Sequence, residues 1–333
     1  MAIKKPARRT QAKKQSARKP PAKKPGARRI PAPREWVAPR LDGKVAVVTG
    51  ASRGAGKGIA LVLGESGATV YVTGRSVRGA PTTDNVPGTI HETAEQITAR
   101  GGRAIAVRCD HTLAPDVEAL FDRVKDEQGR LDILVNNVWG GYEGAGAYPT
   151  HFWKAPLERS WRGMFVAGLR AHLLSCYYGI PIMLPHKRGL VISTVAWDHN
   201  KYLGSFYDIA KHAIVRMIYG LAIELEKHDI PALAVAPGFM RTERVLKYYK
   251  TDEANWRSIP QLRRTETPQY VGRAVAMLAA DGRILRKSGQ AFRVGELAQE
   301  YRFTDVDGRQ VPPFTIPASF EKILEEFERK GTI

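Results

Sequence analysis

The sequence predicts an α/β fold in which a doubly wound parallel sheet of about seven strands carries helices on both faces. Two observations lead to this prediction. From Lys44 onward, short runs rich in β-branched residues alternate with helical stretches, and a glycine-rich turn directly follows the first of these runs. The chain has 333 residues, 43% of them hydrophobic, which is enough to bury one substantial core. We therefore expect a single folded domain.

The strands are expected where β-branched runs are bounded by turn residues. In chain order these runs are residues 45–49, 69–73, 104–107, 131–135, 189–193 and 232–235. A seventh strand is expected around residues 290–294. Strands that alternate with helices in this way form successive βαβ units, so the sheet should be parallel.

The helices between the strands begin with recognisable signals. Thr89 and Glu92 have the spacing of a capping box, in which each side chain bonds the backbone of the other residue. Residues 76–88, which precede this helix, contain Gly and Pro and are longer than a minimal connection needs. We expect a surface loop there.

The first forty residues differ in composition from the rest of the chain. They hold 14 Lys or Arg, seven Pro and one acidic residue, Glu35. Such a segment repels itself and has little apolar surface to bury, so residues 1–40 are expected to form a disordered basic tail. Two interpretations of the tail stay open: a solubilising extension, or a nonspecific and salt-dependent contact with nucleic acid or an anionic surface. Residues 41–333 then form the domain, with a C-terminal extension from about residue 300.

The remaining composition is that of an ordinary globular protein. The whole chain has a net charge of +19, but residues 41–333 carry 38 basic and 32 acidic side chains, which is an ordinary balance. No apolar run is long enough to span a membrane. Cys109 and Cys176 lie in apolar contexts without CxxC spacing, so we expect core thiols in a reducing compartment. A cytoplasmic location is expected. The eight His form no metal-ligand pattern, and no metal site is expected.

The glycine-rich turn predicts a phosphate site. Gly50, Gly54 and Gly56 lie where the first strand passes into a helix. Missing side chains let the backbone approach a phosphate, and the helix N-terminus offers free N–H groups and a partial positive charge. A tight turn needs glycine in any case, but its place directly after the first strand favours a dinucleotide pyrophosphate in a Rossmann-like sheet.

The charge at the end of the second strand bears on cofactor choice. An acidic residue there would bind a ribose 2′-hydroxyl, whereas a basic residue would accept a 2′-phosphate. Arg75 occupies this position, and Arg53 in the glycine turn lies on the same side. Two guanidiniums would hold a phosphate through charge-assisted hydrogen bonds. The sequence therefore predicts NADP(H) rather than NAD(H).

Tyr207 precedes Lys211 by four residues, so both side chains lie on one face of a helix. A phenol titrates near ~10, and a fixed ammonium beside it draws its pKa toward neutrality, where general acid catalysis is effective. The spacing alone arises easily by chance, so it needs confirming context.

Four motifs in one order supply this context. They are Gly50-xxx-Gly54-x-Gly56, Asn136-Asn137, Tyr207-xxx-Lys211 and Pro237-Gly238-xxx-Thr242. With them, residues 41 to about 300 resemble the short-chain dehydrogenase/reductase family. The long loop after Arg75, the segment 237–256 and the residues 297–309 are similar to the family's member 1 type and its bacterial relatives.

The resemblance implies a nicotinamide-dependent oxidoreductase that interconverts a carbonyl and an alcohol, and Arg53 and Arg75 make NADP(H) the expected cofactor. It implies that Tyr207 protonates the substrate oxygen, Thr194 polarises it, and Lys211 lowers the tyrosine pKa and binds the nicotinamide ribose. The cofactor contacts that it implies are Gly50, Ser52, Arg53, Gly54, Gly56, Arg75, Asp110, Asn136, Tyr207, Lys211, Pro237, Gly238 and Thr242. Asp110 and Asn136 could also be mere caps, but their place after parallel strands favours ligand binding.

Two positions depart from the family pattern. Thr194 stands thirteen residues before Tyr207, where the family has a serine. Ser193 is the alternative, because neighbouring strand residues point to opposite faces. Gly168 stands where the family's relay asparagine is expected, which leaves open what positions the proton relay through Lys211.

The partners follow from the same resemblance. We expect a small apolar carbonyl or alcohol substrate, and a homodimer or homotetramer formed through the helices that contain residues 158–179 and 207–228. Aromatic residues that either wall the substrate pocket or fill the core are Trp139, Tyr148, Phe152, Trp153, Trp197, Phe206 and Phe239. The alternative function is a catalytically weak dinucleotide-binding module tethered to nucleic acid, against which the intact Tyr207 and Lys211 argue.

Overall fold

The computed structural model describes residues 33–143, 151–198, 202 and 204–315. Most of the expected basic tail and the aromatic candidate Tyr148 lie outside the described residues. Within them, the expected fold class is confirmed by one sheet of seven parallel strands in the order β3-β2-β1-β4-β5-β6-β7. The strands are β1 (Val45–Val48), β2 (Thr69–Gly74), β3 (Arg103–Arg108), β4 (Ile133–Asn136), β5 (Val191–Thr194), β6 (Ala232–Ala236) and β7 (Ala291–Arg293).

Strand burial follows the position in the sheet. Strands β1, β2, β4, β5 and β6 are buried along their whole length, as expected for parallel strands covered on both faces. The edge strands β3 and β7 are only partly buried. The strand order reverses between β1 and β4, and ligands of open α/β sheets bind at such a reversal.

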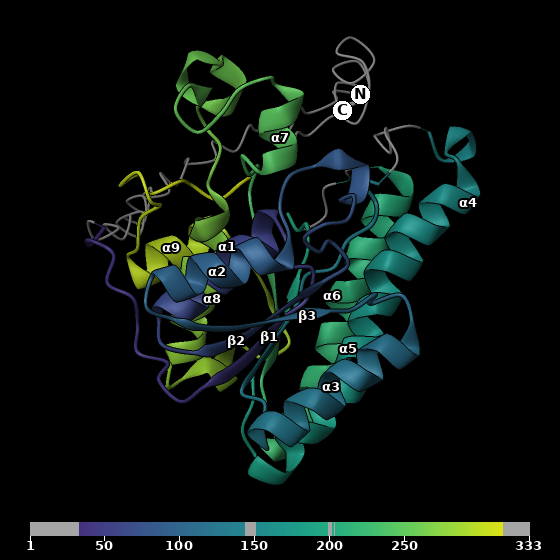
Figure 1. The fold of residues 1–333 in the computed structure, drawn as a ribbon, viewed down its shortest axis with the longest axis vertical. Helices are drawn as coiled ribbons and strands as arrows, with labels where there is room; N and C mark the ends of the chain where they lie inside the picture. The colour runs from purple at the N-terminus through teal and green to yellow at the C-terminus, as the bar shows by residue number, and fades with distance from the viewer. Residues whose placement is uncertain (1–32, 144–150, 199–201, 203, 316–333) are drawn as a thin grey trace, which may run out of the picture. The chain divides into compact units, whose positions relative to one another are not determined.

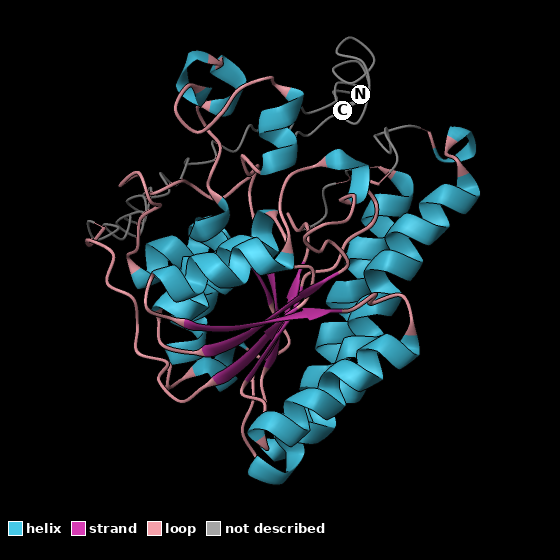
Figure 2. Ribbon diagram, in the orientation of Figure 1, coloured by secondary structure: helices cyan, strands magenta, loops and turns pink. Residues whose placement is uncertain are grey.

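Helices cover both faces of the sheet (Figures 1 and 2). One face carries α1 (Gly54–Glu65), α2 (Ile90–Ala99), α8 (Pro268–Ala280) and α9 (Val294–Tyr301), and the other carries α3 (Ala114–Gln128), α5 (Ala171–Met183) and α6 (Ser205–Leu225). The short helices α4 (Leu157–Ser160) and α7 (Glu243–Tyr248) lie at the periphery of the view in Figure 1. A π-helix, η3 (Trp161–Arg170), runs directly into α5.

Short 3-10 turns complete the described elements. They are η1 (Thr83–Asn85), η2 (Phe152–Lys154), η4 (Leu184–His186), η5 (Glu226–His228), η6 (Trp256–Ser258), η7 (Pro260–Leu262) and η8 (Ile284–Lys287). None of the helices in the described part of the chain is long and apolar enough to cross a bilayer.

The core has two parts, one on each face of the sheet. Ile59, Ile97 and Val275 belong to the cluster under α1, α2 and α8, and Phe121 and Ile214 belong to the cluster under α3 and α6. The second cluster also contains both cysteines. Cys109 and Cys176 are free and buried, which confirms their prediction as core residues, and burial raises the pKa of each thiol to about 12.

The local signals in the sequence also hold. Thr89 caps α2 by accepting the Glu92 N–H at 3.1 Å, and the Glu92 carboxylate accepts the Thr89 N–H at 2.9 Å, which confirms the capping box. Strand β4 begins two residues later than expected, and just before it the Asp132 carboxylate accepts the Val45 N–H and pairs with Arg130.

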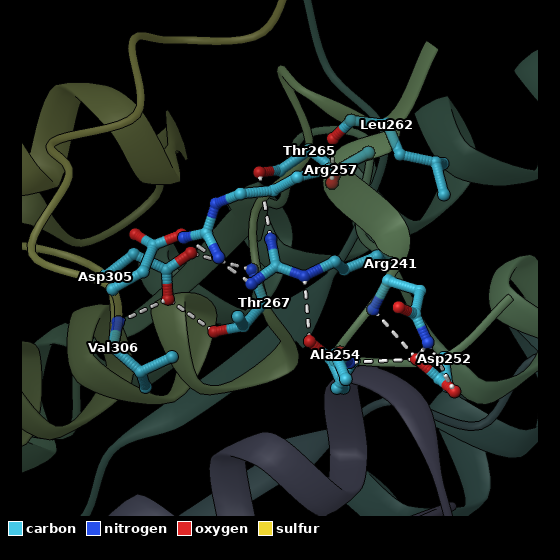
Figure 3. A network of polar contacts seen from close by, with 12 residues as sticks. Arg241, Asp252, Ala254, Arg257, Leu262, Thr265, Thr267, Asp305 and Val306 are labelled. Atoms are coloured by element: carbon cyan, nitrogen blue, oxygen red, sulfur yellow. Dashed lines mark hydrogen bonds and ion pairs between the residues drawn. The ribbon is translucent and has the colours of Figure 1, made fainter. Parts of the chain in front are cut away.

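The segment between β6 and α8, residues 237–267, is fastened by the C-terminal extension (Figure 3). Asp305 accepts the Thr267 N–H at 2.8 Å and bonds the Thr267 hydroxyl at the start of α8. The Asp307 carboxylate pairs with Arg309 at 2.7 Å, Arg257 at 3.6 Å and Arg241 at 3.7 Å.

The Trp256 ring also contacts two of these arginines. The guanidiniums of Arg241 and Arg257 lie 3.9 Å and 4.5 Å from the centroid of the buried Trp256 ring. Arg241 is only 2% exposed, and its Nε donates to Glu253 at 3.0 Å. The segment that follows Pro237 and Gly238 is therefore held by ion pairs to the C-terminal extension and by its own cation–π contacts.

Candidate functional site

A cleft of about 460 Å³ opens at the carboxyl ends of the central strands. The structure brings together twelve of the residues expected to bind cofactor or substrate in this cleft. They are Gly50, Ser52, Arg53, Gly54, Arg75, Asp110, Thr194, Tyr207, Lys211, Pro237, Gly238 and Thr242. Gly56 and Asn136 are the two expected site residues that do not line it.

The glycine turn has the conformation that a phosphate site requires. Gly50 and Gly54 have φ values of +65° and +56°, in the left-handed region that favours glycine. A Cβ on Gly56 would lie 2.2 Å from the Gly50 carbonyl oxygen, so Gly56 lets α1 approach the turn from behind the cleft. The Gly54 N–H, at the N-terminus of α1, donates to the Glu243 carboxylate at 2.8 Å. This helix end binds an anionic oxygen of the chain itself.

The two arginines differ in their surroundings. Arg53 donates to the Ser76 hydroxyl at 2.8 Å and to the Gly88 carbonyl at 2.9 Å, so it is anchored to the loop before α2. Arg75 forms an ion pair with Glu143 across the cleft. Burial raises the pKa of Glu143, although Arg75 opposes this shift. The predicted 2′-phosphate position thus already holds an anion.

Asp110 both caps a turn and lines the cleft. Its carboxylate accepts the Thr112 N–H at 3.0 Å and the Thr112 hydroxyl at 2.7 Å. Burial would raise the pKa of Asp110, but these hydrogen bonds outweigh it and the pKa is lowered. The capping role is therefore observed, and the adenine contact stays a prediction.

The end of β4 separates two asparagines. Asn136 is fully buried, and its amide nitrogen lies 3.1 Å from the Cys176 sulfur. Asn137 lines the cleft instead, where its amide donates to the Gly50 carbonyl at 3.1 Å. Because successive strand residues point to opposite faces, the cleft-facing asparagine is the second of the pair.

The same alternation separates Ser193 from Thr194. Ser193 is fully buried, with its hydroxyl 3.5 Å from the Asn136 amide. Thr194 lines the cleft and donates to the Asn137 side-chain oxygen at 3.2 Å. Of the two alternatives, Thr194 is therefore the one whose side chain reaches the cleft.

The tyrosine and lysine lie on α6, facing the cleft. Lys211 is 6% exposed, and burial lowers its pKa to about 7. Its Nζ lies 5.9 Å from the Tyr207 ring centroid and 3.7 Å from the Trp139 ring centroid. Trp139 meets the Tyr207 ring edge-on at 5.3 Å. The Tyr207 hydroxyl accepts a hydrogen bond from Tyr142 at 3.2 Å.

The aromatic candidates divide between the cleft and other places. Trp139 and Phe239 line the cleft. Phe152 stacks on Phe206 at 5.2 Å, and Trp153 is 78% exposed. Trp197 packs on His212 at a centroid distance of 5.3 Å.

Among the cleft residues that the sequence analysis did not single out are Tyr142, Glu143 and Glu243. None belongs to a spaced motif, and each acts through a partner far away in the sequence, so a single sequence carried no signal for them. In the part of the chain that the structure describes, no three His, Cys, Asp or Glu side chains are grouped to hold a metal ion.

The chain is similar to known proteins. The family model for short chain dehydrogenases matches residues 44–253. "Dehydrogenase/reductase SDR family member 1" of Mus musculus is 35% identical over 286 residues, which covers 84% of this chain and 88% of that protein. The protein of the same name in Homo sapiens is 33% identical over 288 residues, with coverage of 84% and 88%.

A bacterial enzyme is similar in structure as well. 7α-hydroxysteroid dehydrogenase complexed with NADH and 7-oxo glycochenodeoxycholic acid superposes with a TM-score of 0.61 at 27% identity, over 76% of this chain and 93% of that one. A crystal structure of hydroxysteroid dehydrogenase from Escherichia coli gives a TM-score of 0.61 at 28% identity, over 77% and 96%. These matches confirm the resemblance drawn from the four motifs, including its subgroup.

Proposed function

The chain belongs to the short-chain dehydrogenase/reductase family, and from this premise we propose that it is an NADP(H)-dependent reductase that interconverts a carbonyl and an alcohol on a small apolar substrate. Family members are oxidoreductases that use a nicotinamide dinucleotide. The observation that carries the proposal is that one cleft holds Tyr207 with the buried Lys211 and also Arg75, which binds an anion.

The residues present suit the cofactor. Two anion positions in the cleft are satisfied by carboxylates of the chain, with Glu243 at the Gly54 N–H and Glu143 at Arg75. A bound dinucleotide would place its pyrophosphate at the first position and its 2′-phosphate at the second, and both carboxylates would give way. The turn at Gly50 offers backbone without side chains for this approach.

Cofactor choice rests on the two arginines. One of the similar structures holds NADH, so family membership leaves the choice open. Arg75 stands at the end of β2, where an acid would favour NAD(H), and Arg53 is fixed close to it through Ser76. A guanidinium that is paired with a carboxylate is also suited to a phosphate.

The chain's own residues account for the proton chemistry. The bound cofactor would supply or accept the hydride. Tyr207 would donate its phenolic proton to the substrate oxygen, and the Thr194 hydroxyl would polarise the same oxygen. Lys211, held in a buried position, would stabilise the phenolate that remains. Trp139 and Phe239 give the cleft apolar walls.

The proposal is tested by NADPH oxidation against a panel of aldehydes and ketones. The panel should include ring ketones, since a relative is named for a hydroxysteroid. Tyr207→Phe should abolish turnover and leave NADPH binding intact. Turnover that survives this change would refute Tyr207 as the acid, and equal kcat/KM with NADPH and NADH would refute the cofactor choice. A variant that lacks residues 1–40 should keep its activity, since the cleft is built from later residues.

Self-association is proposed through the outer faces of α5 and α6. Leu173 and Tyr177 on α5 are 47% and 73% exposed, and Tyr219 and Ile223 on α6 are 44% and 59% exposed. Each pair is spaced by four residues and so forms one apolar stripe on its helix. Replacement of Tyr177 and Ile223 by Ser should lower the mass in light scattering to that of a monomer. An unchanged mass would place the interface elsewhere.

A further inference from the structure

The indole of Trp139 is flanked by glycines along both of its edges. A Cβ on Gly168 would lie 2.8 Å from Trp139 Cζ3 and 2.9 Å from Cε3. A Cβ on Gly141 would lie 2.8 Å from Cε2, on the opposite edge of the ring. Heavy atoms do not approach a Cβ this closely, so the indole fills the space that a side chain at position 168 would need. Gly168 is the position where a relay asparagine was expected.

The face of the same indole contacts Lys211. The Lys211 Nζ lies 3.7 Å from the ring centroid, well within the range of a cation–π interaction. Burial is the cause of the lowered Lys211 pKa, so the ammonium form is costly here and gains from any attraction.

His172, on α5, bonds the Val138 carbonyl at 3.1 Å and stays neutral because burial lowers its pKa to about 3.

Packing rather than hydrogen bonding fixes the indole. Trp139 Nε1 is buried and has no hydrogen-bond partner among the described residues. The next residue, Gly140, donates its N–H to the Ala167 carbonyl at 3.0 Å. A Cβ on Gly163 would lie 2.8 Å from the Gly140 oxygen, so the turn after β4 rests directly on the π-helix. This support holds the ring over Lys211 in one orientation.

We propose that Trp139 is the residue that positions Lys211 in this enzyme, in place of the relay asparagine, and that position 168 is glycine because the indole occupies its side-chain space. The proposal rests on the proposed function, in which Lys211 acts on Tyr207. In this arrangement an aromatic face, rather than an amide, holds the lysine against the tyrosine. Trp139 touches the Tyr207 ring as well, so one side chain orients both members of the pair.

The first test compares an aromatic with an aliphatic replacement. Trp139→Phe keeps a π face for Lys211 and should retain kcat within about threefold, whereas Trp139→Leu fills space without one and should lose kcat by about tenfold. Trp153→Leu is the matched control, because this tryptophan is 78% exposed and does not line the cleft. Equal kcat for the Phe and Leu variants would show that Trp139 only fills space, and would overturn the proposal.

The second test exchanges the two positions. Gly168→Asn alone should displace the indole and reduce kcat sharply. The addition of Trp139→Ala frees the space, so the double variant should be more active than Gly168→Asn alone, with an asparagine now available to Lys211. If the decreases in kcat of the two single variants simply multiply in the double variant, the proposed exchange between positions 139 and 168 is contradicted.

A third measurement needs neither cofactor nor substrate. The titration of Lys211 can be followed in the ligand-free protein through its side-chain carbon resonances, assigned with Lys211→Arg. Trp139→Leu keeps water out but removes the π face, so the ammonium loses its attraction and the Lys211 pKa should fall below that of Trp139→Phe, which keeps a π face. Equal Lys211 pKa values in the Leu and Phe variants would overturn the proposal. This readout stays valid if Tyr207→Phe retains turnover, so failure of the function and failure of the Trp139 proposal can be told apart.

Discussion

The hydroxyl groups of Tyr142 and Tyr207 lie 3.2 Å apart, with Tyr142 as the donor. Tyr142 is 36% exposed, and its partial desolvation in the cleft, followed by the proximity of Tyr207, raises its pKa well above the usual range. Tyr142 therefore keeps its proton at neutral pH and offers it to the oxygen that we assign as the catalytic acid. A donor at this distance favours the phenolate form of its partner.

Tyr142→Phe should remove this support. Without the donor, Tyr207 becomes harder to ionise, so the rate of alcohol oxidation should reach its plateau about one pH unit higher than in the wild type. The measurement is kcat/KM for oxidation as a function of pH. Tyr219→Phe, on the outer face of α6, is the control. A profile that does not move would mean that the Tyr142 contact has no effect on catalysis.

Glu143→Gln should strengthen NADPH binding. The Glu143 carboxylate competes with a 2′-phosphate for Arg75, so its neutral replacement should lower the Kd for NADPH by about three- to tenfold. The Kd for NADH should change much less, because NADH brings no competing phosphate. Calorimetric titration with both cofactors measures the difference. Glu95→Gln serves as control, since Glu95 pairs with Arg78 at 2.6 Å on the surface. Equal gains for both cofactors would argue against competition at Arg75.

Glu266 should make the protein less stable as the pH rises. This carboxyl is 1% exposed beside Gly238, its Oε1 has no partner in the described residues, and burial raises its pKa to about 8. The folded state thus binds more protons than the unfolded state between pH ~4.5 and pH ~8. The contribution of Glu266 to the free energy of unfolding is fully present below pH ~4.5. It is lost as the pH rises through ~8.

Glu266→Gln should flatten this dependence. Over that window the wild type should lose at most about 5 kcal/mol through this one group, and the Gln variant, which stays neutral, should not. Urea unfolding at pH 5 and pH 8.5 gives the comparison. Glu118→Gln, an exposed change on α3, should follow the wild type. Parallel curves for wild type and Glu266→Gln would place the proton elsewhere.

Asp307→Asn should loosen the segment between β6 and α8. Asp307 is the shared partner of Arg241, Arg257 and Arg309, and its charge removal leaves them to repel one another. We expect a loss of about 1–3 kcal/mol in stability and a higher KM, with faster hydrogen exchange in residues 239–266. Asp126→Asn, on the exposed side of α3, is the control. Unaltered exchange in that segment would show that the network does not hold it.

Local patterns accounted for most of the fold. The β-branched runs predicted all seven strands to within two residues, and the capping box at Thr89 and Glu92 formed as expected. The glycine turn also formed where its residues indicated. These features depend on neighbouring residues, so a single sequence contains the information for them.

Contacts between residues far apart in the chain could not be predicted from the sequence. The Ser193 and Thr194 alternatives differ only in which face of β5 meets the cleft, and a one-residue shift in register exchanges them. The Glu143 contact with Arg75 and the Trp139 contact with Gly168 depend on how a turn after β4 packs on other elements. Arg75 was expected to bind the 2′-phosphate of the cofactor. No sequence pattern indicated that a carboxylate of the chain itself, Glu143, pairs with Arg75.

The contacts of Asp305 and Asp307 also bear on the order in which the site is assembled during synthesis. Chains emerge from the ribosome N-terminus first, and every motif residue of the cleft has emerged once Thr242 is free. The anchors of the segment that follows, Asp305 at Thr267 and Asp307 at Arg241, are made more than thirty residues later. A nascent chain can therefore form its sheet up to β6 while the segment of residues 237–267, which lines the cleft, still lacks its contacts with Asp305 and Asp307. The site becomes complete only when translation has passed Arg309.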